Sequence, residues 1–426
     1  MKPSEMITTI QNGGADIALK KVYVTDSAVE MQKPRYIRTI EKFIELFGDD
    51  RDVMVLSAPG RTEICGNHTD HNNGKVLAAS INLDAIAVAA KNDDNVINEK
   101  SEGHSLNTVD ISELTPSEDM YGKSASMIKG VAAGLKNNGY KIGGFDACTT
   151  SDVMGGSGLS SSAAFEVLLG TVLSHLYNDG NIDAVTIAKV AQYSENVFFG
   201  KPSGLLDQMA SSVGTFVTID FESTENPVIK KVDFDFAKSG YSLCIVDTHG
   251  NHSDLTDDYA AVRGEMESVA KALGKNVLRE ISSDAFFSAI PEITGKVNDR
   301  AILRAVHFYN ENTRVEKAVS ALENNDFDAF KQVITESGFS SFLYNQNVFT
   351  PNNPTEQKLS LALCLSQQLL EGKGAWRVHG GGFAGTIQAF VPNDCLEEYR
   401  KTMDDVFGEG SCHILIIRPV GGTRVI

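Results

Sequence analysis

The stretch that most constrains the fold of this chain is Met-Gly-Gly-Ser-Gly-Leu-Ser-Ser-Ser-Ala-Ala-Phe-Glu, at residues 154–166. Residues 145–150 before it alternate apolar and polar side chains as a strand does, and the apolar run that follows, to Tyr177, is typical of a helix. Glycine permits positive φ and a close approach of backbone N–H groups to a ligand, while serines in a first helical turn add hydroxyls to its unpaired donors. The stretch therefore predicts a strand, a phosphate-binding loop and a helix in succession. The plainer interpretation is a glycine-rich connection capped by serine.

Two familiar phosphate loops do not fit this stretch. A Walker loop ends in Gly-Lys-Ser or Gly-Lys-Thr, and residues 154–166 contain no lysine. The dinucleotide fingerprint needs an acidic residue about 20 residues further on, at the end of a strand that follows a short helix. Here a long helix follows, and no such strand is apparent.

Composition limits the partners of the chain. Its 426 residues suffice for a substantial core and for two domains of ordinary size. A formal net charge of −18 argues against nucleic acid or an anionic membrane surface as a partner. No run approaches a membrane span, the N-terminus has no apolar signal core, and the six cysteines lie far apart without metal-ligand spacing. We expect a cytoplasmic protein that acts as a monomer.

Apolar periodicity outlines two halves of different character. In the first half we expect strands at 53–56 and, as a pair, within 76–90, with helices at 36–47, 124–135, up to 177, 183–199 and 203–212. In the second half a strand at 241–247 precedes a mostly helical region from 255 to 370, and the chain ends with a strand, a helix and a strand at 386–391, 396–407 and 413–417. That last β-α-β order suggests a ferredoxin-like α+β domain. The charged segment 221–239 marks the boundary between residues 1–220 and 221–426.

Three further polar groups interrupt the apolar pattern. Residues 60–74 place Arg, His, Asp and Asn between glycines, and residues 380–385 form a second glycine-rich loop. Between them, Glu195 ends one predicted helix and Asp207 lies inside the next. Their plainer interpretations are a solvated turn, a tight bend before a strand and a helix-surface charge. The apolar neighbours of Asp207, at positions 205, 206 and 209, indicate partial burial instead.

In this order and spacing, the four groups resemble the motifs of the GHMP kinase superfamily and, within it, of the galactokinases. Residues 60–74 are similar to Gly-Arg-x-Asn-x-Ile-Gly-Glu-His-x-Asp-Tyr-x-x-Gly, and residues 154–163 to the ATP loop Pro-x-Gly-x-Gly-Leu-Ser-Ser-Ser-Ala. Residues 195–208 resemble Ala-Glu-His-x-Phe-x-Gly-x-Pro-x-Gly-x-x-Asp-Gln, and residues 380–385 resemble Gly-Gly-Gly-Phe-Gly-Gly. The resemblance begins near Phe43, and an N-terminal extension, residues 1–35, has no counterpart.

The resemblance implies a two-lobed α+β GHMP kinase fold, with a ribosomal-protein-S5-domain-2-like lobe over residues 1–220 and a ferredoxin-like lobe over residues 221–426. It implies transfer of the γ-phosphoryl group of ATP to a sugar hydroxyl, in galactokinases the anomeric 1-OH. Ser162 and Glu195 would coordinate Mg²⁺, both being hard oxygen ligands. The nucleotide-binding residues would be Gly155, Gly156, Ser157, Gly158, Leu159, Ser160, Ser161 and Ser162.

The same resemblance assigns the catalytic and sugar-binding roles. Asp207 would take or orient the proton of the attacking hydroxyl, and Arg61 would offset negative charge in the transition state and lower the pKa of that carboxylate. His68 and Asp70 would hold sugar hydroxyls, since an ionised aspartate accepts several hydrogen bonds. Tyr259 looks like the family tyrosine that donates to the sugar.

Departures from the family pattern bear on the substrate. Asn67 stands where galactokinases have a glutamate that is associated with the C6 hydroxyl, and an amide adds donors while it removes a charge. We therefore also expect, as an alternative to galactose, a sugar altered at C6 or nearby, such as galacturonate, N-acetylgalactosamine or arabinose. Ser124 and Met127 replace two family aromatics beside the adenine, which leaves the nucleotide preference open.

Two other classes of protein stay open. Some relatives of galactokinases sense sugar and ATP without turnover and act through a partner protein. Against a sensor, the catalytic set of Arg61, Ser162, Glu195 and Asp207 is complete. A mevalonate- or homoserine-type kinase is disfavoured, because residues 67–70 form the Asn-His-Thr-Asp cluster typical of the sugar branch.

Overall fold

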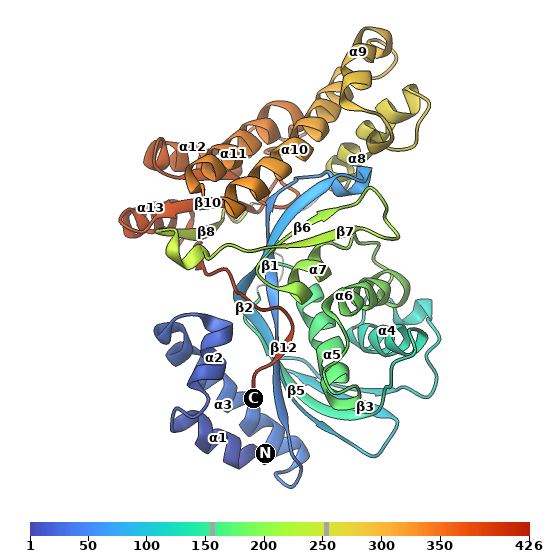
Figure 1. Cartoon of the computed structure of the whole chain (residues 1–426), viewed down its shortest axis with the longest axis vertical. Coiled ribbons are helices and arrows are strands. Elements are labelled where there is room, and N and C mark those ends of the chain that lie inside the picture. The colour runs from blue at the N-terminus through green and yellow to red at the C-terminus, as the bar shows by residue number, and fades with distance from the viewer. Residues whose placement is uncertain (154–157, 251–254) are drawn as a thin grey trace.

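The computed structural model describes residues 1–153, 158–250 and 255–426. Over these residues the chain forms a larger mixed sheet and a smaller antiparallel sheet, each with helices packed against it (Figure 1). The division of strands and helices between two sheets confirms the predicted two-lobed α+β arrangement.

The larger sheet is organised around two long central strands. Its strands are β1 (Met54–Cys65), β2 (Lys75–Lys91), β3 (Val96–Ser101), β4 (Leu106–Asp110), β5 (Phe145–Ser151), β6 (Phe216–Asp220), β7 (Val228–Val232) and β12 (Thr423–Arg424). They follow the order β12-β1-β2-β5-β3-β4, while β6 pairs with the first half of β2 and β7 pairs with β6. β3 and β5 run parallel, so that both end at the same edge of the sheet.

The prediction of paired strands within residues 76–90 is wrong, because β2 runs unbroken through them. The interspersed Asn82 and Asp84 do not mark a turn, since each finds a long-range partner within the fold. Asn82 Oδ1 accepts from the backbone N–H of Ile416 (2.7 Å), and the fully buried Asp84 accepts from Arg35 (2.8 Å). A polar residue can therefore stay inside a strand when a distant segment satisfies it.

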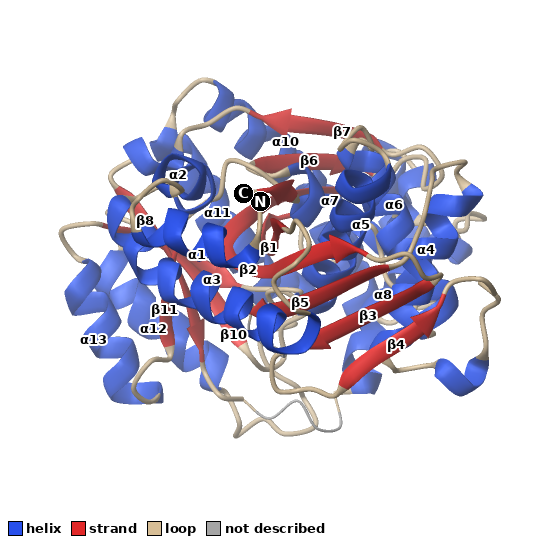
Figure 2. Ribbon diagram, turned by 90° about the horizontal axis from the view of Figure 1, so that it is seen from below, coloured by secondary structure: helices blue, strands red, loops and turns tan. Residues whose placement is uncertain are grey.

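Helices cover both faces of the larger sheet. One face carries α4 (Ser124–Asn137), α5 (Ser161–Tyr177), α6 (Ala184–Tyr193) and α7 (Leu206–Val213). The opposite face carries three helices (Figure 2). These are α1 (Pro3–Gln11) and α2 (Asp16–Tyr23) of the N-terminal extension, and α3 (Asp26–Phe47), which begins in the extension and continues beyond it. In α3, the buried Tyr36, Ile40 and Phe43 recur at helical spacing and pack towards Val55 and Val88 of the sheet.

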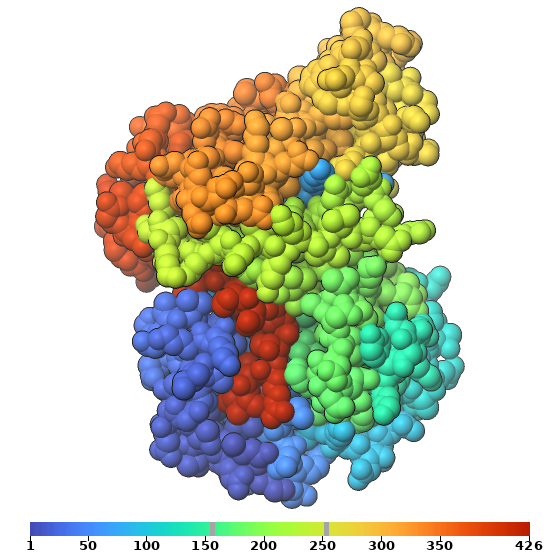
Figure 3. All heavy atoms as spheres, in the orientation of Figure 1, coloured from blue at the N-terminus to red at the C-terminus, as the bar shows by residue number. Residues whose placement is uncertain are grey.

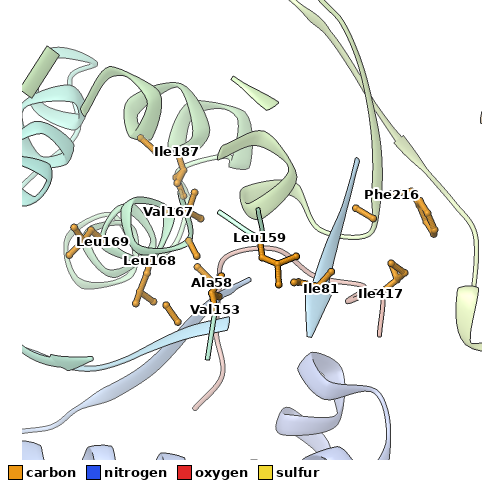
Figure 4. Close-up of a cluster of buried hydrophobic side chains, with 14 of the residues drawn as sticks. Ala58, Ile81, Val153, Leu159, Val167, Leu168, Leu169, Ile187, Phe216 and Ile417 are labelled. Atoms are coloured by element: carbon orange, nitrogen blue, oxygen red, sulfur yellow. The ribbon is translucent and has the colours of Figure 1, made fainter. Parts of the chain in front are cut away.

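The main core lies between the larger sheet and α5. Val153 and Leu159, on either side of the 154–157 segment, are both buried in it, with 5% and 0% of their surface exposed. Figure 4 shows them beside Ala58 of β1, with Val167 of α5 nearby. Apolar packing therefore fixes Val153 and Leu159, and Leu159 directly precedes the N-cap of α5.

The smaller sheet has the predicted ferredoxin-like arrangement. Its strands are β8 (Tyr241–Asp247), β9 (Ala375–Val378), β10 (Thr386–Pro392) and β11 (Cys412–Leu415), in the antiparallel order β11-β8-β10-β9. The helices of this half are α8 (Thr256–Ala272), α9 (Ser283–Ile293), α10 (Asp299–Glu323), α11 (Phe327–Ser340), α12 (Lys358–Leu370) and α13 (Leu396–Phe407). The observed bounds of β8 and α13 are those that the sequence predicts.

The end of the chain returns to the larger sheet. β12 pairs with β1, and the backbone N–H of Val55 donates to the carbonyl of Ile426 (3.0 Å). In Figure 3 this last segment (red) runs between the N-terminal extension (blue) and α5 (green). The larger sheet thus includes β7 and β12, which follow residue 220, and the division at 220 stays a prediction.

Among the helices that the structure describes, none combines the length and the apolar character that crossing a membrane would require.

Candidate active site

The last residues of the glycine-serine loop form the N-terminus of α5. Ser160 is the N-cap of α5 and has a left-handed backbone (φ 61°), a conformation that is costly outside glycine and frequent at functional sites. Leu159 offers a ligand only its backbone, because its side chain lies in the core and its carbonyl accepts from the N–H of Arg61 (3.1 Å). Gly158 follows the segment with φ 73°. Three of the predicted nucleotide-binding residues lie outside the described residues: Gly155, Gly156 and Ser157.

Asp207 lies in the first turn of α7 and faces this loop. Its Oδ1 accepts from Nε and Nη2 of Arg61, on β1, both at 2.7 Å, and its Oδ2 accepts from the hydroxyl of Ser160. Arg61 also donates to the carbonyl of Gly158. The Asp207 side chain is 36% exposed and that of Arg61 is 12% exposed, so the carboxylate is more open to a ligand than the guanidinium with which it pairs. The structure therefore brings Asp207, Arg61 and Ser160 together.

A second carboxylate group lies beside the first turn of α5. Ser162 Oγ donates to Oε1 of Glu195 (3.2 Å), which also accepts from Nζ of Lys201 (3.0 Å). Glu195 Oε2 accepts from Nε2 of Gln208 (2.7 Å), whose amide also reaches the buried Glu166 (3.3 Å). Burial, and then the charge of Glu195, raise the pKa of Glu166 to about 9, so that this carboxyl stays protonated at neutral pH.

The backbone around Glu195 does not have the regular α-helical conformation that the sequence predicts. The sequence predicts one helix over residues 183–199, whereas α6 ends at Tyr193 and a π-helical turn continues over Ser194–Phe199. Such turns occur mostly as single insertions near functional sites. The turn widens the helix at the residue that faces Ser162.

The loop after β1 carries the predicted sugar-binding residues. His68 has a left-handed backbone (φ 58°), and its Nε2 donates to the carbonyl of Gly381 (2.9 Å). Asp70 lies against Gly204, just before α7, where a Cβ on that glycine would stand 3.0 Å from Asp70 Oδ2. Burial raises the pKa of Asp70, and the charge of Asp207 raises it further. Asp70 and Asp207 therefore share one site.

Asn67 is buried between the two halves of the chain, with 1% of its surface exposed. Its Nδ2 donates to Oε1 of Glu63 (3.0 Å) and to the carbonyl of Gly380 (2.7 Å), and its Oδ1 accepts from Nδ2 of Asn347 (2.9 Å). Both hydrogens of the amide are thus used by protein acceptors. Its direct contact with a sugar stays a prediction.

Glu63 stands where the galactokinase signature has asparagine, so the carboxylate and the carboxamide have exchanged positions relative to that signature. Its carboxylate accepts from the buried Arg377 (3.1 Å) as well as from Asn67. The pair at positions 63 and 67 therefore still holds one carboxylate and one carboxamide.

The second glycine-rich loop, residues 380–385, closes over the same region. Tyr259, in the first turn of α8, donates its hydroxyl to the carbonyl of Gly382 (3.0 Å). A Cβ at Gly381 would meet the Tyr259 ring at 2.6 Å, and one at Gly382 would meet the Asn347 carbonyl at 1.9 Å. The loop therefore needs glycine where it touches Tyr259 and Asn347. A bond from Tyr259 to a sugar stays a prediction.

A cavity of about 380 Å³ opens beside the first turn of α5. It is lined by Ser161 and Phe165 of α5 and, from the ends of β3 and β5, by Ser101, Thr149 and Ser151. Its volume lies within the ordinary range for small-molecule sites.

Sequence reasoning missed several polar residues of the site. Gln208 and Glu166 lie inside motifs that the sequence shows, but only the fold joins them to Glu195. Glu63 could have been found, since it departs from the quoted signature. Glu311 of α10 had no signal in the sequence: it is fully buried, and its Oε1 accepts from the N–H of Gly66 (3.0 Å), which ties the loop after β1 to the second half of the chain.

Comparison with known families gives two matches. The model described as the galactokinase galactose-binding signature matches residues 41–91, and the N-terminal domain model of the GHMP kinases matches residues 126–215. The first range contains Arg61 and Asp70, and the second contains the glycine-serine loop, Glu195 and Asp207.

Individual proteins are similar over most of the chain. The galactokinase of Streptomyces coelicolor is 31% identical over 370 residues (86% of this chain and 92% of the relative), and that of Actinobacillus pleuropneumoniae is 32% identical over 388 residues (88% and 94%). The crystal structure of Lactococcus lactis galactokinase complexed with galactose matches with a TM-score of 0.75 and 26% identity, over 90% of this chain and 98% of that one. The mevalonate kinase of Methanococcus jannaschii shares the fold, with a TM-score of 0.58 at 15% identity.

Two galactokinases are more than 30% identical to this chain over nearly their whole length, and two family models match it. The geometry of the site agrees with these matches. The chain belongs to the galactokinase family of the GHMP kinases.

Proposed function

We propose that the protein is an ATP-dependent sugar kinase, which transfers the γ-phosphoryl group to the anomeric hydroxyl of galactose or of a galactose-related sugar. The observation that carries this proposal is the position of Asp207, which Arg61 and Ser160 hold at the end of the glycine-serine loop. The names of the relatives support it, and so does the galactose bound to the Lactococcus lactis enzyme. The reaction would take place between the lobes at residues 1–220 and 221–426.

Asp207 and Arg61 are proposed as the catalytic residues. Phosphoryl transfer depends on positioning and charge stabilisation more than on covalent chemistry. Asp207 would accept the proton of the attacking hydroxyl, because its carboxylate is open to the site. Arg61 would hold that carboxylate and offset the negative charge that develops on the transferred group.

ATP is the proposed phosphoryl donor, and the glycine-serine loop would hold its phosphates at the N-terminus of α5. The chain also fits Mg²⁺, because Ser162 and Glu195 offer two hard oxygen donors next to that loop. Among the described residues no group of three or more His, Cys, Asp or Glu could hold a metal ion. A two-residue site suits Mg²⁺, which usually keeps waters and substrate phosphates as its other ligands. Bound there, Mg²⁺ would neutralise charge on the phosphates.

The sugar would lie between Asp70, Asp207 and the 380–385 loop. His68 and Tyr259 already donate to backbone carbonyls of that loop, so we propose that they shape the sugar site and bind hydroxyls when the loop adjusts. Asn67 would act on the sugar through this loop, since its amide donates to the carbonyl of Gly380.

Galactose is the first candidate substrate, and a sugar altered at C6 or nearby is the second. The specific observation that favours the second is Asn67, where the family has a glutamate. The exchange with Glu63 leaves a carboxylate at the same pair of positions, which supports galactose. A coupled ADP-release assay with galactose, galacturonate, N-acetylgalactosamine and arabinose separates the two: a clear preference for galactose would exclude the altered sugar.

The kinase itself is tested with Asp207→Ala and, as a matched control, Asp119→Ala at an exposed aspartate outside the site. We expect Asp207→Ala to lower turnover by roughly 10²–10⁴ and Asp119→Ala to leave it unchanged, with both variants folded by circular dichroism. Equal activity in the two would remove Asp207 from the mechanism. A protein that binds ATP and sugar yet releases no ADP with any of the four sugars would be a sensor.

We also propose that the protein acts as a monomer in the cytoplasm. The six cysteines are all unpaired, which suits a reducing compartment. Size-exclusion chromatography with light scattering, at a mass of 46.0 kDa for one chain, tests the monomer.

A further inference from the structure

A second cavity, of about 390 Å³, lies between α3 and the larger sheet. It adjoins the cavity beside the first turn of α5, because Glu102, Thr149 and Thr150 line both. One wall is α3, which contributes Arg35, Arg38, Thr39 and Lys42. The other wall is the end of β3 and β5, with Lys100, Glu102, Gly103, Cys148, Thr149 and Thr150. Cys148 packs in the cluster that the extension forms on this face of the sheet. The cavity therefore depends on the packing of α3 against the sheet, and helices α4–α7 cover the opposite face (Figure 2).

The lining of this cavity is basic in a strongly acidic protein. It holds four positively charged side chains and one carboxylate, that of Glu102, whereas the chain as a whole carries −18. Within the described residues, neither Arg38 nor Lys100 forms an ion pair with a carboxylate, although Nζ of Lys100 donates to the carbonyl of His104. Lys42 pairs only with Glu45 one turn further along α3 (2.8 Å), and both side chains are exposed. Such exposed pairs contribute little and are easily exchanged for another anion.

Arg35 adds a buried charge to the cavity. Its Nη2 donates to Asp84 (2.8 Å) and its Nη1 to Asp152, while its Nε is buried and has no hydrogen-bond partner among the residues described. A buried guanidinium donor without a partner is costly. An acceptor inside the cavity would satisfy it.

We infer that this cavity binds a small phosphorylated metabolite, with the phosphate held by Arg38, Lys42 and Lys100 and with hydroxyl groups directed to Thr39 and Thr150. Guanidinium and ammonium groups are the ordinary partners of phosphate. The volume is that of a site for a molecule the size of a sugar phosphate. Glu102 disfavours a second anionic group at the β3 end of the cavity.

We expect a ligand in the cavity to affect the glycine-serine loop. Asp152 lies two residues before position 154. Its carboxylate accepts from both Arg35 and Gln32 of α3 (3.0 Å for Gln32), and its backbone N–H donates to the carbonyl of Asp84 (3.0 Å). A ligand that accepts a hydrogen bond from Arg35 changes the charge beside Asp152. Binding in the cavity should therefore alter the KM for ATP more than turnover.

The test is isothermal titration calorimetry of the full chain with ribose 5-phosphate and, separately, inorganic phosphate. Galactose and a non-hydrolysable ATP analogue are present in excess, so that the active site does not contribute. We expect saturable binding of one equivalent, weakened by salt as contacts between exposed charges are. The double variant Arg38→Glu/Lys42→Glu should weaken binding by at least about tenfold, because it reverses two phosphate contacts. Lys100→Met, which changes the opposite wall and not the helix, should weaken it as well.

The matched control is Lys136→Glu/Lys141→Glu, which reverses two lysines far from the cavity, at the end of α4 and in the loop after it. It should bind as the unaltered protein does. Kinase assays in the presence of ribose 5-phosphate should show a changed KM for ATP in the unaltered protein and no change in Arg38→Glu/Lys42→Glu. Failure of both probes to bind, or equal binding by the charge-reversed and control variants, would overturn the inference. The basal activity of all these variants tests the kinase separately.

Discussion

Asp84 joins the N-terminal extension, the larger sheet and the end of the chain, and its removal should be costly. The side chain is fully buried in β2 and accepts from Arg35 (2.8 Å), from the hydroxyl of Tyr23 (2.9 Å) and from Arg418 (3.1 Å). It also accepts from the hydroxyl of Ser57. One carboxylate therefore compensates two buried guanidiniums from opposite ends of the sequence.

The substitution Asp84→Asn keeps the shape of the side chain and removes its charge. Breaking a buried ion pair by removing one partner costs about 3–5 kcal/mol, since the other charge stays buried and uncompensated. Arg35 would keep Asp152, but Arg418, with no exposed surface, has no other carboxylate partner among the described residues. We therefore expect the free energy of unfolding to fall by about 4 kcal/mol.

The melting temperature should fall with it. A chain of 426 residues has an unfolding entropy of about 0.9 kcal/mol/K if it unfolds as one unit. A loss of about 4 kcal/mol then lowers the melting temperature by roughly 4–5 °C. Urea titration gives the free energy directly, and scanning calorimetry gives the temperature. Asp119→Asn, at an exposed aspartate, is the control and should change neither.

A double substitution separates charge from packing. In Asp84→Asn/Arg418→Met the uncompensated guanidinium is gone, so the double variant should be more stable than the additive effect of its two single variants. If Asp84→Asn costs less than about 1 kcal/mol, or if the two effects simply add, the reasoning from an uncompensated buried charge is refuted.

Three further predictions concern the site. Ser162→Ala should raise the Mg²⁺ concentration needed for half-maximal activity severalfold, because it removes one of the two protein oxygens proposed to bind the ion; an unchanged Mg²⁺ titration would contradict this. Burial holds the pKa of His307 at about 4, below its unfolded value of 6.5. Between these two values the unfolded chain binds more protons than the folded one. The free energy of unfolding therefore falls as the pH drops from 6.5 to 4, by up to about 1.4 kcal/mol per pH unit. His307→Gln should flatten urea-unfolding curves over that window, and an equally steep pH dependence would contradict it. Gly382→Ala should lower the free energy of unfolding by about 2–3 kcal/mol, because φ is +80° and the added Cβ would meet the Asn347 carbonyl; thermal unfolding of the variant measures it.

Local patterns in the sequence suffice where neighbours along the chain decide the structure. α13 is bounded by a sharp loss of amphipathic periodicity at Gly408, and β8 is a nearly continuous apolar run, so both were predicted with their observed bounds. The glycine-serine loop was recognisable for the same reason, since the residues that shape its described end are adjacent in sequence.

Contacts between distant segments explain what the sequence could not predict. β2 stays unbroken at Asp84 because Arg35 and Arg418, 49 and 334 positions away, neutralise it. The sequence of α3 shows an apolar stripe, but such a stripe can pack against any apolar surface. It therefore does not indicate that α3 packs on the larger sheet. Motif order indicated that Asp207 and Arg61 belong to one site, yet the 2.7 Å contact depends on how β1 and α7 pack.

The reversed pair at positions 63 and 67 shows why a single departure from a family motif is a weak guide to substrate. Read alone, Asn67 indicates a lost carboxylate. In the fold, its amide donates to Glu63, which in turn pairs with Arg377, a fully buried residue of the second half of the chain. The charge is thus conserved within the pair, but it has moved from a loop to a strand and is shared with an arginine. Asn67 and Arg377 both donate to Oε1 of Glu63, which leaves Oε2 without either contact. An argument about specificity therefore has to start from the pair rather than from either residue.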